Sequence, residues 1–159
     1  DDPAIGVMLE LFAGSKISPA YRSLVKKRKV ATEVSFFEAP GFAYPNSVFF
    51  YLTPKAPAST GQVLKAFDEE LRRFQSRLPT SEELAVAKRR LAVEHLSGMD
   101  SNMSLAQEFL SSELLYGDWS AYLDWYDKVA AVTAQDVRRV ANQYFQRSNR
   151  TVGTIETKS

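Results

Sequence analysis

The chain has no cysteine and only one histidine, His95, among its 159 residues. Without thiols it forms neither disulfides nor thiolate metal sites. A zinc site would have to be built almost entirely from carboxylates, which zinc rarely accepts as its full ligand set. The inventory therefore predicts that this chain binds no zinc by itself. His95 continues an apolar helical pattern, so we interpret it as a packing or capping residue and not as a ligand.

Long apolar runs and an excess of one charge are also missing. No run approaches the roughly 18 residues that cross a bilayer, and the start, Asp1 and Asp2, is unlike the basic opening of a signal peptide. The formal net charge of +1 gives no reason to expect a polyanionic partner. The basic run at residues 26–29 is interpreted as charge at a helix C-terminus. We expect a soluble protein without a membrane span or a nucleic-acid partner. The compartment, periplasm or cytoplasm in a bacterium, stays open.

Proline, glycine and capping residues divide the chain into elements. Helical periodicity predicts helices over residues 3–13, 18–29, from 59 to before Pro79, 80–97, around 105–114, around 119–129, and from Thr133 to Tyr144. Alternation predicts strands over residues 30–37, 47–53 and 151–157, the first two pairing across a break at Pro40, Gly41, Pro45 and Asn46. The order is ααββαααααβ. It predicts one α+β domain over residues 1–159, with a small antiparallel sheet packed against a layer of helices.

Large aromatic residues fall on both faces of the first two predicted strands, at Phe36, Phe37, Phe49, Phe50 and Tyr51. Because alternate residues point to opposite faces, one face should pack on helices and the other on something else. The rest of a longer polypeptide is the natural candidate. A second aromatic group, Trp119, Tyr122, Trp125 and Tyr126, has helical spacing and is interpreted as core or domain-contact packing.

Three phrases carry a family resemblance through their order: LVKKRKVATEV at residues 24–34, TSEELAVAKRRL at 80–91 and VTAQDVRRVANQYF at 132–145. Together they resemble the C-terminal, non-metal half of the insulinase/pitrilysin/processing-peptidase family of inverzincin zinc metallopeptidases. The resemblance covers nearly the whole chain. Halves of this family normally begin with a strand before the first helix, whereas this chain starts at the helix, which implies a sheet short of its first strand.

The resemblance also implies what the chain does not do. The family's inverted motif H-x-x-E-H, which holds zinc and activates water, is absent here, so zinc is expected in the partner half. Active second halves carry an Arg and a Tyr in L-R-x-x-x-x-x-x-Y, and alignment on Leu24 places Val25 and Thr32 there. Valine has no donor, and the threonine hydroxyl is too short to replace a phenol. We therefore expect no catalytic and no metal-binding residue.

The main hypothesis is a non-catalytic half of a zinc metallopeptidase that forms a wall of a peptide-enclosing chamber. Its expected partners are an N-terminal zinc-binding half-domain, in the same or a separate chain, and an extended peptide substrate; a homo-oligomer is left open. Arg28, Glu33 and Ser35 are the positions expected to face peptide. Two alternatives are a catalytically silent structural or assembly module of the same fold and an unrelated helical interaction domain. The latter would lack an antiparallel sheet backed by helices.

Overall fold

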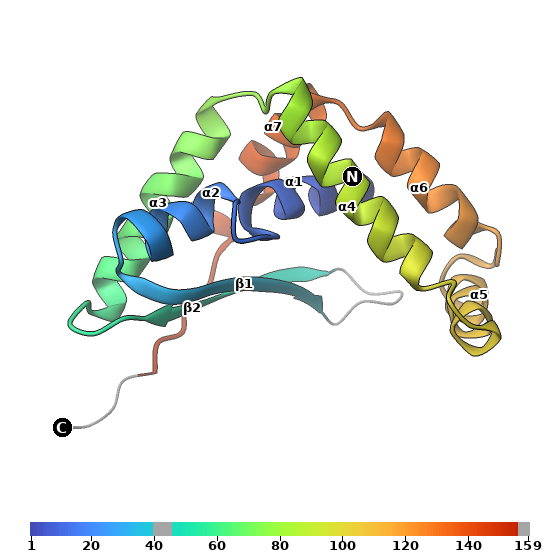
Figure 1. Ribbon diagram of the computed structural model, residues 1–159, viewed down its shortest axis with the longest axis horizontal. Helices are drawn as coiled ribbons and strands as arrows, with labels where there is room; N and C mark the ends of the chain where they lie inside the picture. The colour runs from blue at the N-terminus through green and yellow to red at the C-terminus, as the bar shows by residue number, and fades with distance from the viewer. Residues whose placement is uncertain (40–45, 156–159) are drawn as a thin grey trace.

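The computed structural model describes residues 1–39 and 46–155 (Figure 1). The predicted break at Pro40, Gly41 and Pro45 lies outside the described residues, as do positions 156 and 157 of the last predicted strand. The elements, in chain order, are α1 (Asp2–Ala13), α2 (Pro19–Tyr21), the π-helix η1 (Arg22–Lys27), β1 (Ala31–Ala39), β2 (Ser47–Pro54), α3 (Thr60–Ser76), α4 (Ser81–Ser97), α5 (Asn102–Tyr116), α6 (Ala121–Ala131), α7 (Ala134–Tyr144) and the 3₁₀ turn η2 (Arg147–Asn149). The predicted α+β class is confirmed, and the predicted order holds as far as α7.

Capping side chains fix where several helices begin. In each capping box the N-cap hydroxyl accepts a backbone N–H and the third helical residue accepts the N–H of the N-cap. Such boxes open three helices, with Ser59 and Gln62 at α3, Thr80 and Glu83 at α4, and Thr133 and Asp136 at α7. Each cap contributes about 1 kcal/mol to helix stability. The predicted starts of these helices are therefore confirmed.

The last predicted strand is wrong for the part that the structure describes. Residues 151–155 are irregular, and the side chains of Val152 and Ile155 are 46% and 98% exposed. Alternating apolar residues form a strand only where a neighbouring strand supplies main-chain partners. Among the described residues, the sheet contains β1 and β2 alone. Residues 151–155 pair with neither β1 nor β2, so the alternation alone does not make them a strand.

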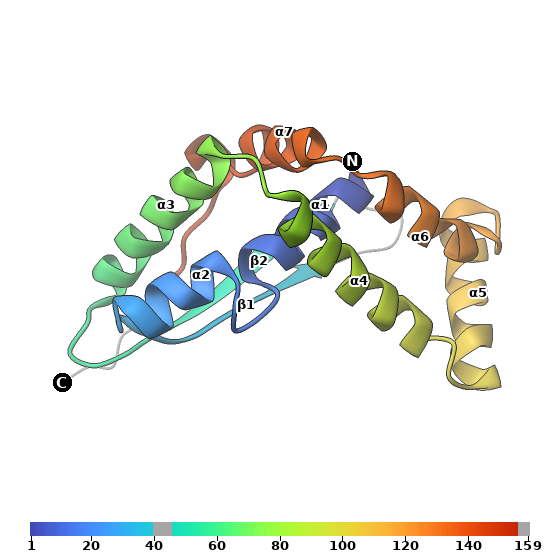
Figure 2. The same cartoon turned by 45° about the horizontal axis from the view of Figure 1, so that its top comes forward.

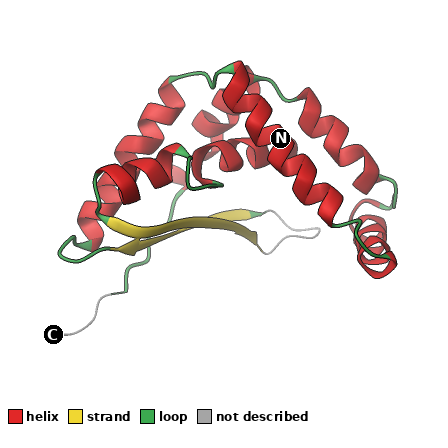
Figure 3. Cartoon of the chain, in the orientation of Figure 1, coloured by secondary structure: helices red, strands yellow, loops and turns green. Residues whose placement is uncertain are grey.

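The sheet is a two-stranded antiparallel ribbon with helices on one side (Figures 1 and 3). Its register pairs Val34 with Leu52 and Phe37 with Phe49. The register shifts between Ala31 and Glu33, which leaves residue 32 as the extra residue of a bulge. None of the helices in the described ranges combines the length and apolar character that a bilayer crossing requires.

Phe12 of α1 lies at the centre of the core and is fully buried. Its ring centroid lies 6.0 Å from that of Phe50 on β2, and 5.5 Å and 5.3 Å from those of Phe67 and Phe74 on α3. Edge-to-face and tilted pairs at such separations add to the stabilisation from apolar burial. The aromatic group therefore joins the first helix, the sheet and α3 into one core.

The chain turns into β1 through an irregular helix end. In η1 the N–H of Arg28 donates to the carbonyl oxygen of Ser23, five residues earlier, at 2.8 Å. Lys29 follows with a φ of 55°, in the left-handed region that glycine usually occupies. This π-helical turn is not predicted by the sequence pattern. It directs the chain from the helix layer into the sheet.

Asp68 of α3 fastens the C-terminal segment to the helix layer. Its side chain is only 8% exposed and accepts hydrogen bonds from Arg147 at 2.9 Å and from Arg150 at 2.5 Å. Burial alone would raise the pKa of this carboxyl, but the hydrogen bonds and charges of Arg150 and Arg147 outweigh burial and lower it. Asp68 is therefore an ionised anchor between elements about 80 residues apart in sequence.

Candidate functional site

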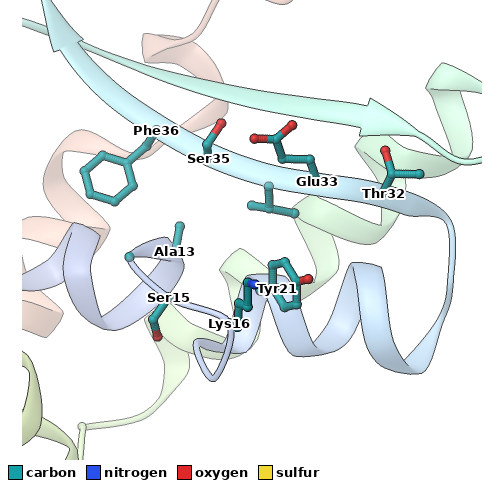
Figure 4. Close-up of a pocket in the computed structure, with 10 residues that line it drawn as sticks. Ala13, Ser15, Lys16, Tyr21, Thr32, Glu33, Ser35 and Phe36 are labelled. Atoms are coloured by element: carbon teal, nitrogen blue, oxygen red, sulfur yellow. The ribbon is translucent and has the colours of Figure 1, made fainter.

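An open pocket of about 540 Å³ runs beside β1 (Figure 4). One wall is formed by residues 32–36, five consecutive positions of the strand. Consecutive strand residues point to opposite faces of a sheet, so these five share only their main-chain edge. Since β2 pairs with the other edge of β1, the pocket follows the edge of β1 that has no strand partner among the described residues.

The opposite wall comes from the turn after α1. It comprises residues 13–16 and Tyr21. The turn is fixed by Ser18, which is buried and whose Oγ–H and N–H both donate to the carbonyl oxygen of Ser15, at 2.6 and 3.1 Å. Sequence reasoning missed this wall, although Gly14 and the Ser18-Pro19 restart signalled a turn there. The pocket between this turn and β1 is therefore preformed.

Two of the predicted peptide-facing residues, Glu33 and Ser35, line this pocket. Their side chains point away from the α1–α2 turn, whereas Phe36 points toward the helices (Figure 4). Arg28 does not join them. Its Nη1 lies 2.6 Å from Oε2 of Glu69 on α3, and this hydrogen bond lowers the pKa of the Glu69 carboxyl. The structure thus brings together two of the three predicted residues.

Val25 and Thr32, the two positions that align with the family's Arg and Tyr, have structural contacts in this chain. Val25 is half-buried and packs against the hydrophobic core. Thr32 occupies the bulge, and its Oγ1 donates to the carbonyl oxygen of Thr53 across the sheet at 3.3 Å. Neither side chain offers the pocket a cation or a phenol.

The aromatic residues of the strands divide between the two faces as the alternation predicts. Phe36 and Phe50 pack with the helix-side core. On the other face Phe37 stacks on Phe49 and Tyr51, with ring centroids 4.8 and 5.5 Å apart, and these three side chains are 42%, 44% and 59% exposed. The outer face of the sheet therefore carries an exposed aromatic stack beside the edge pocket.

The residues that the structure describes do not fit a zinc ion. In the described part of the chain no three His, Cys, Asp or Glu side chains come close enough to hold a metal. The ring of His95 packs against those of Tyr122 and Trp125, with centroids 4.3 and 5.4 Å apart, and the Tyr122 hydroxyl donates to the His95 carbonyl oxygen at 2.9 Å. Burial lowers the pKa of His95, against an opposing effect of the Glu108 charge. His95 is the packing residue that the sequence predicts.

We therefore expect no stoichiometric zinc uptake by this chain at neutral pH. The measurement is calorimetric titration with zinc sulfate, checked by native mass spectrometry. The His95→Ala variant serves as the matched control and should give the same flat titration. Tight uptake of one ion that the H95A change abolishes would contradict the prediction.

Comparison with known proteins decides the family. Residues 1–91, more than half of the chain, match the peptidase M16 inactive domain. The chain belongs to the peptidase M16 family. The match runs from α1 into α4, so it includes the sheet and both walls of the edge pocket. It confirms the resemblance drawn from the three sequence phrases and rules out an unrelated helical domain.

A curated relative is much longer than this chain. The chain is 27% identical over 157 residues to an uncharacterized zinc protease of Streptomyces coelicolor, covering 98% of this chain and 34% of that protein. The chain therefore spans about a third of the length of that relative.

Solved structures share the fold. The inactive peptidase domain of a proposed zinc protease from Bordetella parapertussis matches with a TM-score of 0.84 and 22% identity, over 99% of this chain and 85% of that one. The peptidase M16 inactive domain from Pseudomonas fluorescens matches with a TM-score of 0.74 and 23% identity, over 90% of this chain and 34% of that one. At these identities the likeness concerns the arrangement of helices and sheet.

Proposed function

We propose that this chain is the non-metal half of a two-part zinc metallopeptidase and forms one wall of a chamber that encloses extended peptide. Its family match is to an inactive domain, and the Streptomyces coelicolor relative, named a zinc protease, is about three times as long. Zinc and the chemistry of bond cleavage would lie in an N-terminal partner half. This chain's own task would be to bind and orient the substrate.

The observation that carries the proposal is the strand edge of β1 in the pocket. An unpaired strand edge presents main-chain N–H and C=O groups to the solvent. An extended peptide that adds to it forms main-chain hydrogen bonds whatever its side chains are. Residues 32–36 offer about 16 Å of such an edge. Alternate side chains of the added segment would lie beside Ser35 and the aromatic stack.

The test uses the 159-residue chain and a short peptide of alternating valine and threonine, with binding followed by amide NMR. Two further versions of the peptide are N-methylated, each at the amides of one edge only. Strand addition needs one edge of the peptide, so methylation of that edge should weaken binding at least about tenfold, while methylation of the other should leave it unchanged. The largest shifts should fall on residues 32–36.

The two methylated peptides control for each other, because their side chains are identical. Equal binding of all three peptides, or shifts confined to residues outside the pocket, would refute strand addition at β1. For the larger proposal, a chain that also contains the zinc-binding half should cleave unfolded peptide in a reaction that a chelator stops. Absence of that activity would refute a peptidase role.

A structural or assembly module of the same fold is the second candidate. It is favoured by the surroundings of Val25 and Thr32, since one side chain packs against the core and the hydroxyl of the other is engaged across the sheet. Under this alternative the β1 edge would bind no free peptide. The N-methylation series therefore separates the two candidates.

A further inference from the structure

Charge is strongly segregated along the chain. Residues 91–127, here called the arm, contain no lysine or arginine. They contain seven carboxylates, Glu94, Asp100, Glu108, Glu113, Asp118, Asp124 and Asp127. The arm thus has a formal charge of −7 within a chain of net charge +1, which leaves +8 for the rest. None of the ion pairs among the described residues includes an arm carboxylate.

The arm projects from the body of the molecule. It comprises the end of α4, all of α5 and most of α6, and Figures 1 and 2 both show α5 at the end farthest from α3. The α5 helix is held through Phe109, whose ring centroid lies 5.1 Å from that of Trp119 and 6.3 Å from that of Tyr122. Most of the α5 surface is therefore open.

That open surface carries an apolar stripe. Met103, Leu110 and Leu114 follow one another at intervals of seven and four residues, which places them on one face of the helix. Their side chains are 71%, 60% and 75% exposed. Leu96 lies near the end of α4, before α5, and Trp119 lies just after α5. Both residues are also more than half exposed. Apolar groups at this spacing are the pattern that a partner helix contacts.

We infer that the arm is a docking surface for a basic amphipathic helix of a partner protein. Leucine-like side chains of that helix would cover the α5 stripe, and its lysine or arginine side chains would face the unpaired arm carboxylates. The negative charge of the arm argues against two other binding partners for this surface. Anionic lipid head groups would be repelled, because membrane-surface helices depend on basic residues. A second arm would bring together two surfaces of the same sign.

The arm also supplies its own probe. The chain has two tryptophans, Trp119 and Trp125, and both belong to the arm. The experiment titrates the 159-residue chain with a synthetic helical peptide of about 18 residues, with leucine at helical spacing and lysine elsewhere. A counterpart carries glutamate at every lysine position. We expect the lysine peptide to bind at a ratio of one to one and to shift the tryptophan emission, and added salt to weaken that binding. The glutamate peptide should not bind.

Variants locate the surface. Leu110→Ser with Leu114→Ser should weaken binding of the lysine peptide at least about tenfold. The matched control is Ile17→Ser with Ile155→Ser, two changes of the same kind at exposed positions outside the arm, which should leave binding unchanged. Circular dichroism checks that both double variants stay folded.

Several outcomes would overturn the inference. They are equal binding of the two peptides, equal binding of the L110S/L114S variant, and no binding of the lysine peptide. A dimer of the chain that the L110S/L114S change dissolves in sedimentation would also overturn it, in favour of a second copy. The inference does not rest on the proposed peptidase role, because the β1 edge and the arm are tested with different peptides and different signals.

Discussion

Replacing Phe12 by alanine should lower the free energy of unfolding by about 3–5 kcal/mol. The side chain is fully buried and packs against Phe50, Phe67 and Phe74, which come from β2 and α3. Its removal leaves a cavity between elements that cannot close independently, so lost apolar burial and lost packing both contribute. Urea denaturation followed by circular dichroism measures the change.

Phe37→Ala provides the matched control. Phe37 is 42% exposed on the outer face of the sheet, so its truncation should cost less than about 1.5 kcal/mol. Similar destabilisation by both changes would mean that the core does not centre on Phe12. A near-neutral F12A variant would mean the same.

Asp68→Asn should destabilise the fold by about 2–3 kcal/mol at neutral pH. The carboxylate is nearly buried and pairs with Arg150 and Arg147. An amide replaces charge-assisted acceptors with a group that turns an N–H₂ toward a guanidinium. Arg147 is 79% exposed and adds little, so most of the effect should come from Arg150. Asp124→Asn, the same change at an exposed position without an ion pair, should shift stability by less than about 0.5 kcal/mol.

The Asp68 anchor also predicts a pH dependence. Its pKa is lowered in the folded state because Arg150 and Arg147 outweigh the effect of burial. A carboxyl with a depressed folded pKa contributes stability above its unfolded pKa of about 3.9, and that contribution is lost as the pH falls through the folded value. The stability difference between the parent chain and D68N should therefore be constant at neutral pH and shrink in acid.

The stability of the parent chain as a function of pH combines the effect of Asp68 with the effects of other carboxyls. The difference in stability between the parent chain and D68N is therefore the informative measurement. Burial raises the pKa of Glu10 and of Glu38. Raised carboxyl pKa values act with the opposite sign, since they favour the folded state as the pH falls. Urea midpoints from neutral pH into acid for both chains measure the effect. A difference that stays constant in acid would contradict the role of Asp68.

The helices and the sheet pair follow from local signals. Ser59, Thr80 and Thr133 mark helix starts through hydrogen bonds within four residues, and the alternation of the two strands fixes which aromatic residues turn inward. Signals of this range are contained in the sequence itself. The failed strand at residues 151–155 obeys the same alternation but depends on a distant partner, which no local pattern specifies.

The candidate site also has parts that the sequence predicts and parts that it does not. From the sequence we expect Arg28, Glu33 and Ser35 to face peptide, and Glu33 and Ser35 line the pocket. Arg28 instead pairs with Glu69, 41 residues away in sequence. The turn at residues 13–16 is itself local, since Ser18 bonds to Ser15, but its place opposite the strand depends on the packing of α1 and α2 against β1. Contacts between distant segments decide both, and a single sequence does not specify those contacts.

The π-helical turn at η1 has an evolutionary consequence. Such a turn holds one more residue than an α-helical turn over the same rise, and it can arise from a single insertion into an ordinary helix. Deleting one residue between Arg22 and Lys27 would leave a regular helix that still delivers the chain to β1. Family members should therefore differ in length by one residue at this point, while keeping the strand and its neighbours in place.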